Sequence, residues 1–156
     1  MRLQELFSPA DILVAFAARD KWDALDRMLA RLGRRGRVPA ALLPEVHEAV
    51  LARERSMSTG MERGIAIPHA AVEGLDALVA SLAITPRERG LNFESIDGSP
   101  THLVVLLLIP RSQKLLHIRT LADVARVLGD DEVREALVAA RTSEAAWEVL
   151  GRQPPE

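Results

Sequence analysis

Hydrophobic residues form short continuous runs along the chain, and stripes of helical spacing separate these runs. The runs Ile12–Ala18, Leu78–Ile84 and Leu103–Ile109 predict strands, and the last is apolar throughout, as in a strand covered on both faces. A shorter strand is predicted at 65–67, where Pro68 must end it or confine it to a sheet edge.

Helical spacing of apolar residues predicts much of the remaining chain. Five helices are expected: Lys21–Leu32 with Asp20 as N-cap, one opening near Pro44, one along 121–128, Asp131–Ala140 and Ser143–Leu150. The polar connection between the last two long strands contains an Asp97-Gly98 turn signal and a short strand near 91–94. Because strands alternate with helices, the predicted fold class is α/β, with helices on both sides of the sheet.

Length and composition fit a single soluble domain. The chain has 156 residues, of which 48% are apolar and 27% charged, so we expect one domain over residues 1–151 and a disordered tail over 152–156. The longest apolar run is far shorter than the roughly 20 residues that span a bilayer, and no secretory pattern opens the chain. We therefore expect a cytoplasmic protein without membrane insertion.

Two further features exclude classes of function. The sequence has no cysteine, which rules out disulfides, thiolate metal sites and a cysteine nucleophile. The net charge is −2 and aromatic residues make up 3% of the chain, which argues against a nucleic-acid surface built on positive charge and base stacking. No nucleic-acid partner is expected.

The stretch 53–69, R-E-R-S-M-S-T-G-M-E-R-G-I-A-I-P-H, carries a candidate phosphate-binding loop. Gly60 and Gly64 allow backbone N–H groups to turn toward an anion, and Ser58 and Thr59 add hydroxyl donors. The same composition is also that of a plain turn.

His69, at the end of this stretch, is the candidate nucleophile. The fixed φ of Pro68 presents it in a restricted direction, and a neutral imidazole is suited to reversible phosphoryl transfer. His117 opens a later helix on its apolar face, where a neutral ring can donate an N–H to a phosphoryl group. Arg53 can add a charge-assisted bond to the same oxygens. A histidine on the apolar face of a helix, such as His117, is also often a core residue whose hydrogen bonds are made within the protein.

A basic run follows the first predicted helix, and it too has two interpretations. It is a candidate partner-binding patch, but cations are also simply favoured after a helix C-terminus. The run comprises Arg31, Arg34, Arg35 and Arg37. The remaining histidines, His47 and His102, carry no chemical signal.

Three segments of the chain together resemble the fructose/mannitol-type enzyme IIA domain of the bacterial sugar phosphotransferase system. They are R-E-R-S-M-S-T-G-M-E-R-G-I-A-I-P-H-A, D-G-S-P-T-H-L-V-V-L-L-L-I-P and L-L-H-I-R-T-L-A-D-V-A-R-V-L. The S-T-G followed by G-I-A-I-P-H is most similar to the nitrogen-regulatory branch. The resemblance covers nearly the whole chain and implies a mixed sheet flanked by helices.

The resemblance also implies roles for single residues. His69 closes the A-I-P-H segment and takes the place of the phosphorylated histidine, His117 that of the assisting histidine, and Arg53 that of a third active-site member. The implied phosphoryl donor is a small phosphocarrier protein of the HPr type. No metal and no organic cofactor are implied.

One departure from the family pattern lies in the loop. The family usually has a second glycine and a small polar residue where this chain has Met61-Glu62-Arg63. A carboxylate at Glu62 would repel a phosphoryl group unless it faces solvent or pairs with Arg63 or Arg55.

Four functions remain open on the sequence. The first is a regulatory phosphocarrier that binds partners differently once His69 is modified, and the second is a sugar-transport component that passes the group to a separate enzyme IIB. The third is a metal site on His69 and His117, which lacks the usual helical spacing of ligands. The fourth is a degenerate interaction domain that is not phosphorylated.

Overall fold

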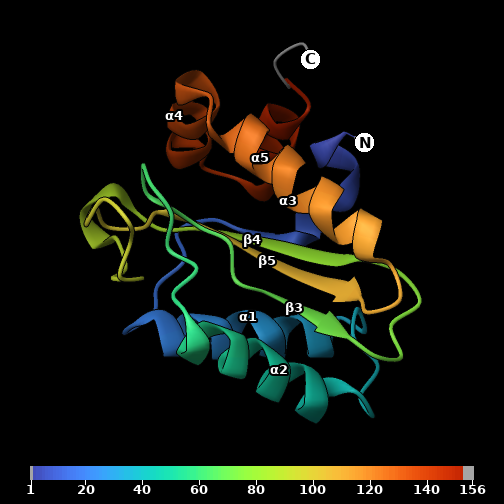
Figure 1. Ribbon diagram of the computed structural model, residues 1–156. Coiled ribbons are helices and arrows are strands. Elements are labelled where there is room, and N and C mark those ends of the chain that lie inside the picture. The colour runs from blue at the N-terminus through green and yellow to red at the C-terminus, as the bar shows by residue number, and fades with distance from the viewer. Residues whose placement is uncertain (1, 153–156) are drawn as a thin grey trace.

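A computed structural model describes residues 2–152 as a mixed five-stranded sheet between two layers of helices (Figure 1). The strands are β1 (Ile12–Leu13), β2 (Ile65–Ala66), β3 (His69–Val72), β4 (Val79–Ile84) and β5 (Leu103–Pro110). The helices are α1 (Lys21–Arg34), α2 (Leu43–Ser56), α3 (Lys114–Leu128), α4 (Asp131–Ala139) and α5 (Ser143–Leu150). Short 3₁₀ turns lie at η1 (Leu3–Leu6), η2 (Pro9–Asp11) and η3 (Arg87–Arg89). The α/β class and the mixed sheet are both confirmed.

The sheet is organised around β5. It pairs antiparallel with β4 on one side and parallel with both β2 and β3 on the other, and β1 extends the sheet beyond β4 as a parallel edge strand. Every residue of β5 is buried. The continuous apolar run was therefore a correct sign of a strand covered on both faces.

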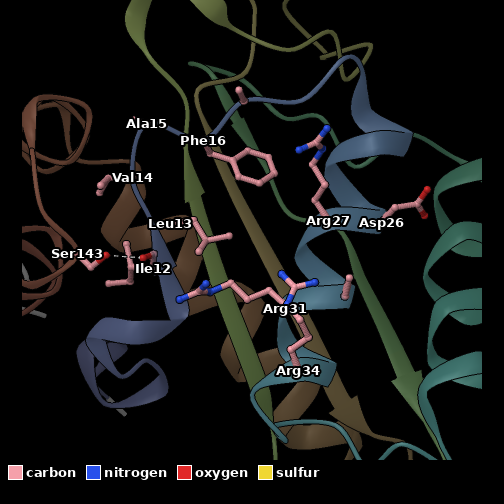
Figure 2. Close-up of a pocket in the computed structure, with 12 residues that line it drawn as sticks. Ile12, Leu13, Val14, Ala15, Phe16, Asp26, Arg27, Arg31, Arg34 and Ser143 are labelled. Carbon is pink, nitrogen blue, oxygen red and sulfur yellow. Dashed lines mark hydrogen bonds between the residues drawn. The ribbon is translucent and has the colours of Figure 1, made fainter.

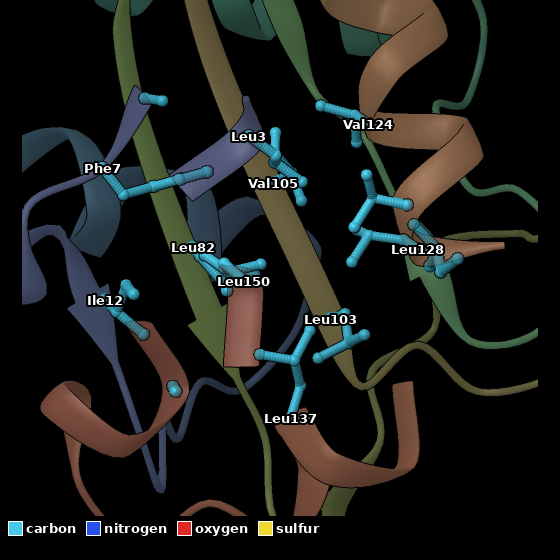
Figure 3. Close-up of a cluster of buried hydrophobic side chains, with 14 of the residues drawn as sticks. Leu3, Phe7, Ile12, Leu82, Leu103, Val105, Val124, Leu128, Leu137 and Leu150 are labelled. Atoms are coloured by element: carbon cyan, nitrogen blue, oxygen red, sulfur yellow. The ribbon is translucent and has the colours of Figure 1, made fainter. Parts of the chain in front are cut away.

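Alternate residues of β5 contribute to two separate cores. Val105 and Leu107 pack toward η1, α3, α4 and α5, and Figure 3 shows this core with Leu3, Val124 and Leu137 around the strand. Leu106 and its alternate neighbours pack toward α1 and α2, which lie together beneath the sheet in Figure 1. The period of two along a strand thus divides one apolar run between two helical layers.

Most predicted elements are present, and the differences have local causes. The strand predicted over 12–18 is wrong beyond Leu13, because Ala15 has a positive φ of 51° and turns the chain. The strand near 91–94 is reduced to one bridge between Leu91 and Thr101. Of the predicted tail, Arg152 lies in the turn after α5, where its N–H donates to the Val149 carbonyl at 2.9 Å, and 153–156 lie outside the described residues.

None of the helices within residues 2–152 combines the length and the apolar character needed to cross a membrane.

Candidate active site

His69 is the first residue of β3, immediately after a break in the sheet. β2 and β3 lie along the same side of β5, and Ile67 and Pro68 separate them. Pro68 has no N–H to give to a ladder, but its carbonyl accepts a hydrogen bond from the N–H of Leu107 at 3.0 Å. The proline therefore interrupts the strand without releasing it from β5, which fixes the backbone on which the imidazole stands.

A hydrogen bond within this break sets the tautomer of His69. Its Nδ1 lies 2.8 Å from the carbonyl oxygen of Ile67. Because a carbonyl only accepts, Nδ1 must carry the proton, so Nε2 of the neutral ring keeps its lone pair. The bond orients the ring and leaves Nε2 as the nitrogen with the free lone pair.

The structure brings His117 against His69. The two ring centroids are 5.4 Å apart, with the ring planes at 73°. His117 lies near the start of α3, which follows β5, and both histidines are half-buried. Two half-buried imidazoles in contact, one on β3 and one on α3, can act on the same small group.

Burial is the largest cause of a lowered pKa at His69, and the positive charges of Arg53 and His117 add to it. The Ile67 carbonyl and Glu54 act in the opposite direction but do not outweigh these effects. Arg53 stands in the last turn of α2, where its guanidinium donates to the carbonyl of Met57 at 2.7 Å. The three residues that the motifs singled out thus act on one another, and they keep His69 neutral near pH 7.

Comparison with known proteins decides the family. The family model described as "Phosphoenolpyruvate-dependent sugar phosphotransferase system, EIIA 2" matches residues 5–153. This chain belongs to that enzyme IIA family. It is a component of a phosphotransferase system, as the motifs suggested.

Individual relatives include both branches of the family. The nitrogen regulatory protein of Bradyrhizobium diazoefficiens is 34% identical over 155 residues, which cover 99% of this chain and 97% of that protein. The crystal structure of nitrogen regulatory protein IIA-Ntr from Neisseria meningitidis superposes with a TM-score of 0.82 at 25% identity, over 95% of this chain and 98% of that one. Enzyme IIA mannitol of Escherichia coli, in its complex with phosphorylated enzyme IIB, shares the fold with a TM-score of 0.77 at 23% identity, over 94% and 98% of the two chains.

Glu54 is a buried carboxylate in this enzyme IIA site that the sequence analysis missed. It accepts hydrogen bonds from the Thr59 backbone N–H at 3.0 Å, the Thr59 hydroxyl at 2.5 Å and the Lys21 ammonium at 3.2 Å. Lys21 in turn pairs with Glu94 at 3.1 Å. A threonine five residues after the R-E pair was the available signal, but the pairing with α1 was not visible from local sequence.

The predicted phosphoryl-binding loop is held by internal contacts. The Ser58 hydroxyl donates to the Phe93 carbonyl and accepts from the Gly60 N–H, while the Thr59 hydroxyl is committed to Glu54. Gly60 lies so close to Phe93 that an added Cβ would stand 2.7 Å from its carbonyl oxygen. Gly64 has a φ of +79°, and its own carbonyl accepts from the N–H groups of His102 and Leu103. A further role of these four residues toward a phosphoryl group stays a prediction.

The departure from the family pattern lies at the protein surface, since Met61, Glu62 and Arg63 are all exposed. The backbone N–H of Arg63 donates to Asp97 at 2.9 Å, and its guanidinium donates to the Gly129 carbonyl at 3.1 Å. Arg55 pairs with Glu48 instead. Within residues 2–152 Glu62 has no ion-pair partner. Glu62 therefore faces solvent and pairs with neither Arg63 nor Arg55.

The described residues contain no group of three or more histidine, aspartate or glutamate side chains placed to hold a metal ion.

Proposed function

We propose that this enzyme IIA protein is a cytoplasmic phosphoryl carrier that accepts a phosphoryl group on Nε2 of His69 from an HPr-like phosphocarrier, and that it acts mainly in regulation. The observation that carries the proposal is the hydrogen bond from Nδ1 of His69 to the Ile67 carbonyl, beside the ring of His117. It leaves a neutral, oriented nucleophile at a site that a partner protein can reach.

The transfer step needs positioning more than covalent help from the protein. The Nε2 lone pair of His69 forms the new N–P bond as the N–P bond of the donor breaks, and that bonding pair returns to the donor imidazole. The proton on Nδ1 stays in its bond to the Ile67 carbonyl, which stabilises the positive charge that develops on the ring. His117 and Arg53 supply hydrogen-bond donors for the equatorial oxygens.

The regulatory role rests on relatives rather than on geometry. The full-length relative from Bradyrhizobium diazoefficiens is a nitrogen regulatory protein. A phosphoryl group adds about −1.5 to −2 charge at pH 7, enough to change which surfaces dock at the site. The second candidate is transport, with transfer to a separate enzyme IIB, because the structural relative from Escherichia coli is an enzyme IIA seen with phosphorylated enzyme IIB.

The test is phosphorylation of the purified protein with phosphoenolpyruvate, enzyme I and an HPr-type protein, followed by intact mass. We expect one acid-labile phosphoryl group on the native chain and on His47→Ala, and none on His69→Ala. His47 is the matched control because it is a half-buried histidine like His69 but lies on α2, where it pairs with Asp26 of α1. Labelling of His69→Ala would contradict the assignment.

Onward transfer distinguishes the remaining roles. His117→Ala should accept the group slowly and pass it on poorly, while Glu62→Gly should accept at the native rate because Glu62 faces solvent. Absence of labelling with any HPr-type donor would instead support a degenerate interaction domain.

A further inference from the structure

A groove of about 780 Å³ lies at the sheet edge opposite His69 (Figure 2). The segment 12–17, which contains β1, forms one wall, and one face of α1 forms the other. β4 and β5 stand between β1 and β3, so the groove is separated from His69 by three strand spacings, roughly 14 Å. It is distinct from the phosphoryl site.

The helical wall of the groove is basic. Arg27, Arg31 and Arg34 line it from positions i, i+4 and i+7 of α1, and Figure 2 shows Arg31 reaching across toward β1. Only Arg27 is neutralised, by Asp23 at 3.0 Å. Arg34 has no ion-pair partner among the described residues. Arg31 donates from Nη2 to the Ala10 carbonyl at 3.4 Å, while its Nε is buried without a hydrogen-bond partner.

The strand wall also offers donors. Beyond Leu13 the chain leaves the sheet at Ala15 and returns at Phe16, whose N–H bonds to the Ile84 carbonyl at 2.9 Å. Within residues 2–152, the backbone N–H groups of Val14, Ala15 and Ala17 donate to no other group. Guanidinium groups on one wall and residues with unpaired N–H groups on the other therefore line the same groove, and both kinds of group are suited to an anion.

The spacing of the three arginines favours an anion in the form of an extended peptide with acidic side chains. Successive positions i, i+4 and i+7 lie about 6 and 4.5 Å apart along a helix axis, and alternate residues of an extended chain lie about 6.6 Å apart. Acidic side chains at every second position of a strand therefore come into register with successive arginines. An open groove between an edge strand and a helix is also the setting in which peptides bind by strand addition.

We propose that this groove binds an extended acidic segment of a partner protein, with carboxylates at alternate positions facing Arg27, Arg31 and Arg34. The backbone of the segment lies beside Leu13 and the irregular stretch 14–17 that follows β1. Ser143 limits the site at its start, because its hydroxyl already donates to the Ile12 carbonyl at 2.7 Å. Asp26 also lines the groove, and its negative charge weakens the binding of carboxylates there. Its contact with the His47 ring at 2.6 Å does not remove that charge while the ring is neutral.

The experiment uses a fluorescein-labelled peptide, Val-Glu-Val-Glu-Val-Glu, and fluorescence anisotropy with the full chain at low salt. A peptide of equal composition and charge, Val-Val-Val-Glu-Glu-Glu, is the control for simple charge attraction. We expect the alternating peptide to bind more tightly. In NMR spectra of the protein, the backbone amide chemical shifts that change on adding this peptide should be those of residues 13–17 and α1 rather than those around His69. Equal binding of the two peptides, or no binding of either, would overturn the proposal.

Three variants separate the groove from general surface charge. Arg34→Gln should weaken binding about fivefold, as for loss of one exposed ion pair. Arg141→Gln removes the same charge from an exposed position between α4 and α5 and should leave binding unchanged. Asp26→Asn should strengthen binding. If Arg34→Gln and Arg141→Gln weaken binding equally, the site is not the groove.

Discussion

The protonation of His69 is controlled by its burial and by groups on two helices. Burial, the guanidinium of Arg53 on α2 and the ring of His117 on α3 all lower its pKa from the ordinary 6.5. We predict that Arg53→Gln raises the pKa of His69, because removing a nearby positive charge favours the imidazolium. Histidine ring shifts followed by NMR across pH 4 to 8 measure this directly.

The matched control for this titration is Arg55→Gln, in the same turn of α2. Arg55 is exposed and pairs with Glu48, so the pKa of His69 should not move. The lowered pKa of His69 also makes the stability of the protein depend on pH. Because the folded pKa lies below the unfolded 6.5, the unfolded chain takes up the proton first, and the native protein loses stability as pH falls from 6.5 toward the folded pKa. A midpoint for His69 at or above 6.5 in the native protein would contradict this account.

The second residue with a clear titration argument is Asp11, the last residue of η2, which is 2% exposed. Burial alone would raise its pKa, but hydrogen bonds from Ser8 and Arg37 outweigh burial and lower it. Arg35 pairs with the same carboxylate at 2.5 Å. Half of the basic run that the sequence offered as a partner-binding patch is therefore used within the protein.

We predict that Asp11→Asn lowers the free energy of unfolding at pH 7 by about 3 kcal/mol, because it leaves two guanidinium groups without their carboxylate. The stabilisation from Asp11 is present above pH 3.8 and is lost as pH falls through its lowered folded pKa. The difference between native and variant should therefore begin to shrink in urea titrations below pH 3.8. A constant difference from pH 7 to pH 2 would exclude the ion pairs as its source.

At the scale of elements, the sequence pattern predicted the helices and caps that depend on interactions between residues close in sequence. α5 was predicted with its observed bounds, and Asp20 caps α1 by accepting from the Asp23 N–H at 2.8 Å. β3 was missed because Ala70 and Ala71 have little preference for strands, and only pairing with β5 holds them extended. The sequence motifs located His69, but its place on an edge of the sheet and the Glu54 network depend on contacts distant in sequence.

The close approach of the loop before β2 to the 91–95 segment gives a prediction at this scale. In Gly60→Ala the new methyl group would stand 2.7 Å from the Phe93 carbonyl, a backbone atom that cannot rotate away. We predict a loss of about 2 kcal/mol in the free energy of unfolding, typical of overpacking, together with slower phosphoryl acceptance. Chemical denaturation of the purified variant measures the first effect.

Gly33→Ala is the matched control for this substitution. Its methyl group would stand 2.8 Å from Leu43, but the atom is the end of a flexible side chain. Alanine also favours the helix in which Gly33 lies by about 1 kcal/mol, so this variant should be as stable as the native protein or more stable. Equal losses in the two variants would show that the contact with the Phe93 backbone is not the cause.

At the scale of the whole molecule, one sheet joins two helical layers whose cores do not touch each other except through it. Leu107 belongs to the core beneath α3 and α5, whereas Leu106 belongs to the core over α1 and α2. Because both residues are fully buried on the same strand, loss of either core removes the support of β5 for the other. The two layers should therefore unfold together.

The two tryptophans allow this coupling to be measured, since Trp22 lies on α1 in one layer and Trp147 on α5 in the other. Trp22→Phe and Trp147→Phe each leave one tryptophan as the fluorescent reporter. The change in the free energy of unfolding that each substitution causes is measured by circular dichroism and subtracted. We predict that both reporters then show a single urea transition with the same free energy of unfolding. Leu107→Ala should then lower the stability seen by Trp22 by about 3 kcal/mol, the usual cost of such a truncation, although Leu107 faces the opposite layer. If the Trp22 transition does not respond to Leu107→Ala, the layer that carries Arg53 and the layer that carries His117 unfold independently. Arg53 and His117 would then lie together beside His69 only while both layers are folded.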